Sequence, residues 1–138
     1  MTPEILARIT LARAERDLSD LARAAVGTAA ADVSPAERIK AARRSRQLVN
    51  EIVDRTVLVA ALAGTSWEDI ARSLNRRDPG TVEAEYEDSV AAWRAMSQEE
   101  LTEAAAAGAE GLDAWYAWHR EDYDPAEESP VADLLNLG

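Results

Sequence analysis

The carboxylates that follow Asp78-Pro79 are the first side chains in this sequence whose spacing could support chemistry. Glu83 and Glu87 are four residues apart and Asp88 follows, so all three share one side of a helix that begins at Pro79. A general acid among them would need an apolar setting that raises its pKa, and no pair of carboxylates in the chain has one. We interpret Glu83, Glu87 and Asp88 as an acidic face that contacts a protein partner.

The cations form two groups, one between residues 38 and 46 and one just before Asp78. Both groups could contact phosphates or an acidic protein surface, including the acidic C-terminal half of this chain. Ion pairing along the helices is the alternative, because several of these arginines lie within one turn of a carboxylate. The candidate contact residues are Arg38, Lys40, Arg43, Arg44, Arg46, Arg72, Arg76 and Arg77.

Residues suited to metal or covalent chemistry are scarce. The chain has no cysteine, and His119 is its only histidine. His119, Glu121 and Asp122 are too close together in the sequence to surround a metal ion. There is also no glycine-rich phosphate loop and no nucleophile motif. We therefore expect no catalytic residue, no cofactor and no metal site, and we expect a protein that is not an enzyme.

Residues 57–93 must position the acidic face and the arginines before Asp78, and they combine apolar spacing, turns and caps in the order of a helix-turn-helix-like unit. An apolar helix ends near Gly64, a capping box at Thr65 and Glu68 opens a short helix, and Asp78-Pro79 opens the next one. Seven residues are predicted to form the inner faces of this unit: Trp67, Ile70, Ala71, Leu74, Val82, Tyr86 and Trp93. The acidic face then points outward.

Two long helices are predicted before this unit, over about 3–27 and 35–63, because Thr2-Pro3 and Ser34-Pro35 each place proline just after a capping residue. Another helix begins after Ser97. Beyond Asp124-Pro125 the composition turns to Glu, Ser and Pro, which predicts an acidic, flexible tail over 124–138. The expected fold is all-α, with one domain of about five helices over residues 1–123.

Aromatic side chains gather after Gly111. Because the chain has no phenylalanine, Trp115, Tyr116, Trp118 and Tyr123 are predicted to supply core volume or to dock within the molecule. A ligand pocket is the alternative, since tryptophan and tyrosine are favoured at binding surfaces.

Residues 57–93 resemble the helix-turn-helix of DNA-binding regulators, in particular the fourth region of sigma factors. The resemblance rests on Trp67, Ile70, Ala71 and Leu74 in the short helix and on Gly80-Thr81-Val82 at the start of the second. It implies a tight helix pair and a second helix that reads DNA. The turn is one residue longer than in that family, Asn75 stands where glycine is common, and an acidic second helix would repel phosphates.

Charge divides the chain into residues 1–77, with a net charge of +3, and residues 78–138, with a net charge of −14. Together with the acidic second helix, this predicts a small, non-catalytic regulatory protein linked to transcription or nucleic-acid machinery that acts mainly through protein contact. A DNA-binding helix-turn-helix transcriptional regulator is the alternative, and an acidic nucleic-acid mimic is a remoter one. The sequence also leaves open whether the protein forms a homodimer. We expect a cytoplasmic protein without membrane contact, because no apolar run is long enough to cross a bilayer.

Overall fold

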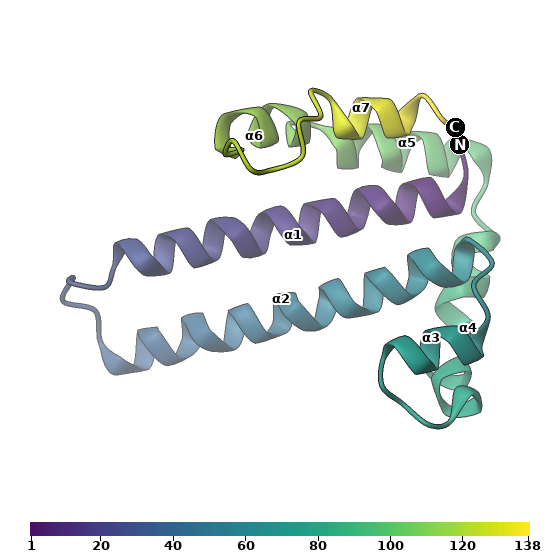
Figure 1. The fold of residues 1–138 in the computed structure, drawn as a ribbon, viewed down its shortest axis with the longest axis horizontal. Coiled ribbons are helices and arrows are strands. Elements are labelled where there is room, and N and C mark those ends of the chain that lie inside the picture. Colours follow the sequence, from purple (N-terminus) through teal and green to yellow (C-terminus); the bar gives the residue numbers. More distant parts are fainter.

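Two long antiparallel helices form the axis of the molecule in the computed structural model, which describes residues 1–138. Helix α1 (Pro3–Gly27) and helix α2 (Pro35–Leu62) lie side by side along almost their whole length (Figure 1). Each begins as expected from its cap, since Thr2 Oγ1 accepts a hydrogen bond from the Ile5 amide and Ser34 Oγ accepts one from the Glu37 amide.

The next two helices pack at the C-terminal end of α2. Helix α3 (Trp67–Ser73) and helix α4 (Pro79–Arg94) both contact α2 and each other. Their shared core also includes Ala7 from α1, so four helices, α1 to α4, pack together at this end of the hairpin. The buried members of this first core are Ala7, Val57, Leu58, Ala61, Ile70, Ala71, Val82 and Val90.

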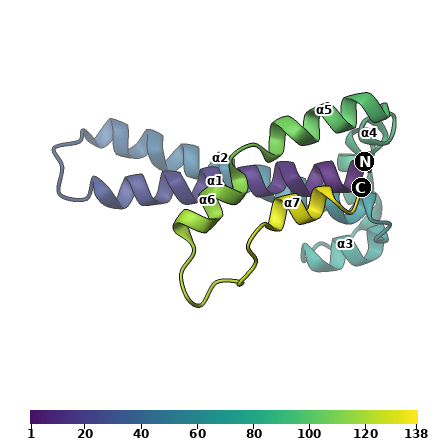
Figure 2. The same cartoon turned by 90° about the horizontal axis from the view of Figure 1, so that it is seen from above.

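Three further helices cover the other side of α1. Helix α5 (Gln98–Ala109) and helix α7 (Pro130–Leu135) lie next to each other on α1, and helix α6 (Leu112–His119) follows α5 (Figures 1 and 2). Gly108 permits the close approach of α5, because a β-carbon there would lie 3.0 Å from Ile9 Cγ2. The second core consists of Ile5, Leu6, Ile9, Leu101, Ala105, Leu112 and Val131.

The all-α, single-domain fold is confirmed, with seven helices instead of about five. One additional helix arises because Gly111 adopts a φ of +77° and separates α5 from α6. The other is α7, which lies within the expected flexible tail. That expectation is wrong for residues 130–135, since Asp113 accepts hydrogen bonds from the Val131 and Ala132 amides and Val131 is buried.

Two smaller expectations also need correction. Helix α3 is capped by Ser66, whose Oγ accepts from the Asp69 amide, and not by Thr65. Among the aromatic residues, Trp115 and Tyr116 are partly buried, but the side chains of Trp118 and Tyr123 are exposed. These two rings therefore contribute no core volume.

No helix in the structure combines the length and apolar character needed to span a bilayer.

Candidate functional site

The turn between α3 and α4 is held by local hydrogen bonds. Asn75 adopts a φ of 57°, which allows the Arg76 amide to donate to the Ala71 carbonyl at 2.8 Å. Asp78 caps α4 by accepting from the Gly80 amide at 3.0 Å and from the Thr81 hydroxyl. The hydrogen bond from Thr81, followed by that from Gly80, holds the pKa of Asp78 below its ordinary value. The Asp78 carboxylate thus stays ionised and accepts a hydrogen bond from an amide in the first turn of α4.

The inner side of α4 faces α2 and α3. Val82 and Val90 are buried, and Tyr86 and Trp93 pack against the first core. The Tyr86 hydroxyl donates to Asp54 Oδ1 on α2 at 2.7 Å, and partial burial followed by this carboxylate raises the pKa of Tyr86. The remaining residues predicted for the inner faces, Trp67, Ile70, Ala71 and Leu74, lie in or against the same core. All seven therefore lie together at one end of the hairpin.

The outer side of α4 carries uncompensated negative charge. Glu83, Glu87 and Asp88 are exposed, and none of them forms an ion pair or a hydrogen bond through its side chain. Glu85 differs from them, since Arg76 Nη1 lies 2.5 Å from its Oε2. This hydrogen bond raises the pKa of Arg76 and so keeps its guanidinium charged. The structure thus presents the predicted acidic face as three free carboxylates.

Half of the predicted cationic contacts are already engaged within the chain. Arg38 donates to the Thr28 and Ala31 carbonyls at 3.0 Å and so fastens the loop between α1 and α2. Arg44 lies 3.9 Å from Glu51, and Arg72 lies 2.9 Å from Asp69. Together with Arg76, these are the engaged residues. The other four predicted contact residues, Lys40, Arg43, Arg46 and Arg77, are exposed and form no ion pair.

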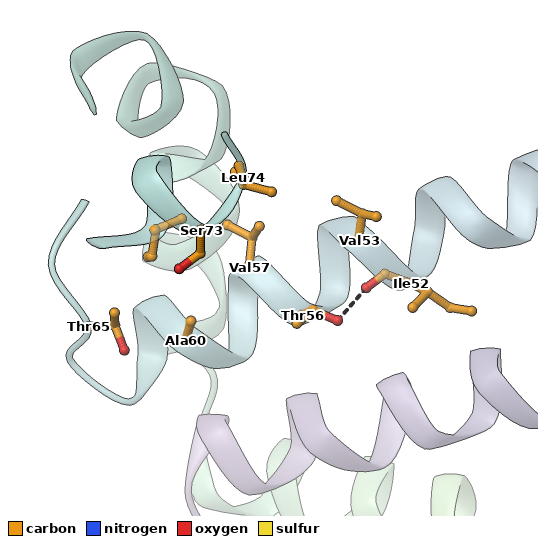
Figure 3. A pocket seen from close by; sticks show the side chains of 9 residues that line it. Ile52, Val53, Thr56, Val57, Ala60, Thr65, Ser73 and Leu74 are labelled. Atoms are coloured by element: carbon orange, nitrogen blue, oxygen red, sulfur yellow. Dashed lines mark hydrogen bonds between the residues drawn. The ribbon is translucent and has the colours of Figure 1, made fainter. Parts of the chain in front are cut away.

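The two cationic groups do not form one surface. Residues 38–46 lie on the N-terminal half of α2, whereas Arg72, Arg76 and Arg77 lie at or just after the C-terminal end of α3, which packs beside Val53 of α2. The step of seven residues along α2 from Arg46 to Val53, which faces Leu74 at the end of α3 (Figure 3), corresponds to about 10 Å at ~1.5 Å per residue. The two groups are therefore separated by about two turns of α2, and a ligand that contacts both must bridge this gap.

An apolar groove between α2 and α3 is a feature that the sequence analysis did not predict. Val53 and Val57 of α2 and Leu74 at the end of α3 point toward this groove, and Thr65 lies at its far end (Figure 3). Its lining is Ile52, Val53, Thr56, Val57, Ala60, Thr65, Ile70, Ser73 and Leu74. The signal in the sequence was the segment TVLVAALA, which is apolar on more sides than α1 alone can cover.

The groove is small and open. Its volume of about 280 Å³ is at the lower limit of small-molecule pockets, and no charged residue lies in its lining. Such a groove suits a few apolar side chains of a macromolecular partner better than a bound cofactor. No group of three or more His, Cys, Asp or Glu side chains lies close enough together to hold a metal ion.

Comparisons with models of protein families, with curated proteins and with solved structures found no match to this chain.

Proposed function

We propose that this chain is a non-catalytic regulatory protein that acts through protein contact, with the acidic face of α4 as a principal contact surface. The observation that supports this proposal is the free charge of Glu83, Glu87 and Asp88 on the exposed side of α4. In a DNA-reading helix-turn-helix, the corresponding side lies in the major groove close to phosphates. Three unpaired carboxylates there oppose DNA and favour a partner surface with positive charge.

The link to transcription or nucleic-acid machinery rests on the resemblance of residues 57–93 to the fourth region of sigma factors. The unpaired cations are too few and too dispersed to offset the acidic face. Arg77 is the one unpaired cation in the turn between α3 and α4, and Lys40, Arg43 and Arg46 lie in the N-terminal half of α2. Contact with DNA through these residues would be limited to phosphates. The scaffold therefore suits a protein that meets such machinery through protein surfaces.

Duplex binding tests the proposal against the DNA-binding alternative. We expect weak binding of mixed-sequence duplexes in a fluorescence anisotropy titration, with a steep loss as salt increases and little sequence preference. Selection from a random duplex library should yield no enriched motif. Sequence-selective binding in the nanomolar range at physiological salt would contradict the proposal and identify a DNA-binding regulator.

A charge-neutral variant tests the acidic face itself. The triple change Glu83→Gln, Glu87→Gln and Asp88→Asn should weaken binding of an arginine-rich helical peptide, because it removes the free carboxylates but no buried contact. The matched control is Glu99→Gln, Glu103→Gln and Glu110→Gln, which removes the same charge from exposed positions at α5. Equal losses in the two variants would show that net charge alone attracts the peptide, and would refute the assignment to α4.

A further inference from the structure

Helix α2 has one side that nothing in the molecule covers. Helix α1 lies along one side of α2, and α3 and α4 cover the opposite side only near its C-terminal end (Figure 1). The side chains of Ile39, Val49 and Val53 are consequently 61%, 45% and 40% exposed. We call Ile39, Ala42, Arg43, Arg46, Val49 and Val53 the α2 free face.

The α2 free face has the spacing of a coiled-coil seam. Ile39, Arg46, Val53 and Ala60 are seven residues apart, and Ala42, Val49 and Thr56 form a second series with the same period. These two series correspond to the a and d positions of a heptad repeat, which align a second helix along the first. An occupant of this face is therefore expected to be a helix that runs nearly parallel or antiparallel to α2.

The seam leads directly into the apolar groove. Val53, Thr56 and Ala60 belong both to the seam and to the groove lining, where Leu74 faces Val53 and Val57 (Figure 3). A helix on the α2 free face would thus end against α3 and place apolar side chains between Val53 and Leu74. From Ile39 to Ala60 the seam is about 32 Å long at ~1.5 Å per residue, which corresponds to three heptads.

The charge of the α2 free face indicates which kind of helix it can bind. Arg43 and Arg46 have no carboxylate partner. The two carboxylates that follow Arg46 on α2 are engaged elsewhere, since Glu51 pairs with Arg44 and Arg55 while Asp54 accepts from Tyr86. A helix whose apolar stripe is flanked by Glu or Asp would complement both the aliphatic and the cationic residues.

A second copy of the chain is a poor occupant of this face. Arg46 stands at the centre of the uncovered stretch from Ile39 to Val53, so an antiparallel copy would bring Arg46 against its equivalent. A parallel copy would align both Arg43 and Arg46 with their equivalents. Nucleic acid fits no better, because Ile39, Val49 and Val53 would remain exposed beside phosphates.

We propose that the α2 free face, together with the groove beneath α3, binds an amphipathic helix of a partner protein whose apolar stripe is flanked by carboxylates. The chain shows the same kind of packing on α1, where the acidic, alanine-rich α5 buries Leu101 and Ala105 and its Gly108 carbonyl accepts from Arg13 at 3.1 Å. The inference deepens the proposed function and rests on it for the view that the protein acts through protein contact.

A designed peptide pair provides the test with the full-length chain. The acidic probe is a labelled three-heptad peptide with leucine at a and d and glutamate at the flanking positions, and the comparison probe carries lysine in place of glutamate. In fluorescence anisotropy we expect saturable binding of the acidic peptide only. Amide shifts of the isotope-labelled protein should map this binding to residues 39–60 and Leu74.

Two sets of variants locate the binding. The double change Val49→Asp and Val53→Asp should weaken binding of the acidic peptide at least tenfold. Val26→Asp, at a valine of α1 that is 75% exposed, should leave this binding unchanged. The double change Arg43→Glu and Arg46→Glu should also weaken binding of the acidic peptide, and it should allow the lysine peptide to bind. Arg77→Glu is the control for a charge reversal at an exposed, unpaired arginine away from this face. Circular dichroism checks the fold, and the arginine pair remains informative if the valine pair unfolds.

The proposal is overturned if the acidic peptide does not saturate, if both peptides bind equally, or if the shifts map elsewhere. It is also overturned if the free chain is a dimer in sedimentation equilibrium and the valine pair makes it monomeric, because a second copy would then occupy the face. These failures leave the acidic face of α4 untouched. Sequence-selective DNA binding, in contrast, would refute the proposed function without any change on α2.

Discussion

At residue scale, Asn75 has a backbone conformation that most side chains disfavour. Its φ of 57° lies in the left-handed region, and it is the only residue other than glycine with a positive φ. Asn75→Gly should therefore preserve or slightly raise the free energy of unfolding, whereas Asn75→Val should lower it by about 1–2 kcal/mol. Urea titration measures both changes. Equal stability of the glycine and valine variants would show that the turn does not require this conformation.

Asp20 links α6 to α1 through a charge that depends on pH. Its Oδ1 accepts from Trp115 Nε1 at 2.9 Å and also pairs with Arg23. The hydrogen bond from Trp115 is the main reason why the pKa of Asp20 is lowered. A lowered pKa in the folded state adds stability above the unfolded pKa of ~3.9, and that stability is lost as the pH falls through the folded value.

Asp20→Asn should consequently lower the free energy of unfolding at pH 7, and the difference from the unmodified protein should shrink below about pH 4. Urea titrations at a series of pH values measure this convergence. Asp88→Asn is the control, because the exposed Asp88 carboxylate has no partner. A difference that persists unchanged at low pH would show that Asp20 acts through packing and not through its charge.

At element scale, the helices that were predicted correctly are those with local start signals. The caps Thr2, Ser34, Asp78 and Ser97 all precede a helix, and Ser97 forms a complete capping box with Glu100. Helix α7 has the same kind of local signal, since Ser129 precedes Pro130 as Ser34 precedes Pro35, but the Ser129 side chain makes no capping hydrogen bond. The first amides of α7 donate instead to Asp113, which is distant in the sequence, so the local pattern could not indicate how this helix docks.

The alanines of α5 show the same limit. From the sequence alone, this run of small residues predicts a loosely packed segment, and that prediction is wrong, because Ala105 is fully buried against α1, like Ala71 between α3 and α4. We expect Ala71→Leu and Ala105→Leu each to cost about 1–3 kcal/mol of stability through overpacking. Ala107→Leu, at an exposed position of α5, should cost little. A denaturant titration in which Ala105→Leu behaves like Ala107→Leu would contradict the packing of α5 on α1.

The docking of α7 depends on Asp113. Its two carboxylate oxygens accept from the Val131 and Ala132 amides at 2.8 and 2.9 Å, so Asp113→Ala leaves both amides without a partner. We expect a loss of about 1–2 kcal/mol and faster hydrogen exchange in residues 130–135. The control is Asp133→Ala, an exposed residue within α7. Unchanged exchange in Asp113→Ala would mean that Val131 alone holds the helix.

At the scale of the whole molecule, the sequence predicted which charged residues are exposed but not which contacts they form within the chain. Glu83, Glu87 and Asp88 lie outward as the helical period required. The Arg76–Glu85 pair, the Arg38 contacts with the interhelical loop and the groove along Val53 all join residues from separate elements. Such arrangements depend on how the helices pack, which a one-dimensional pattern does not contain.

Packing also explains how two hydrophobic cores can behave as one domain. Trp93 contacts both cores, and α1 contributes Ala7 to the first core and Ile5, Leu6 and Ile9 to the second. We expect the unmodified protein to unfold in a single transition, with far-ultraviolet circular dichroism and tryptophan fluorescence coinciding. Trp93→Ala should lower the free energy of unfolding by ~3 kcal/mol, because it removes a large ring from both cores.

The Trp93→Ala variant also tests whether the cores are coupled. If Trp93 carries much of the coupling, hydrogen exchange in the variant should accelerate in α3 and α4 on one side and in α5 and α7 on the other. Trp118→Ala, at a ring that is 85% exposed, should change neither stability nor exchange. If hydrogen exchange accelerates on only one side of the molecule, Trp93 belongs to a single core. In that case α1 alone joins the unit formed by α2, α3 and α4 to the helices that follow it.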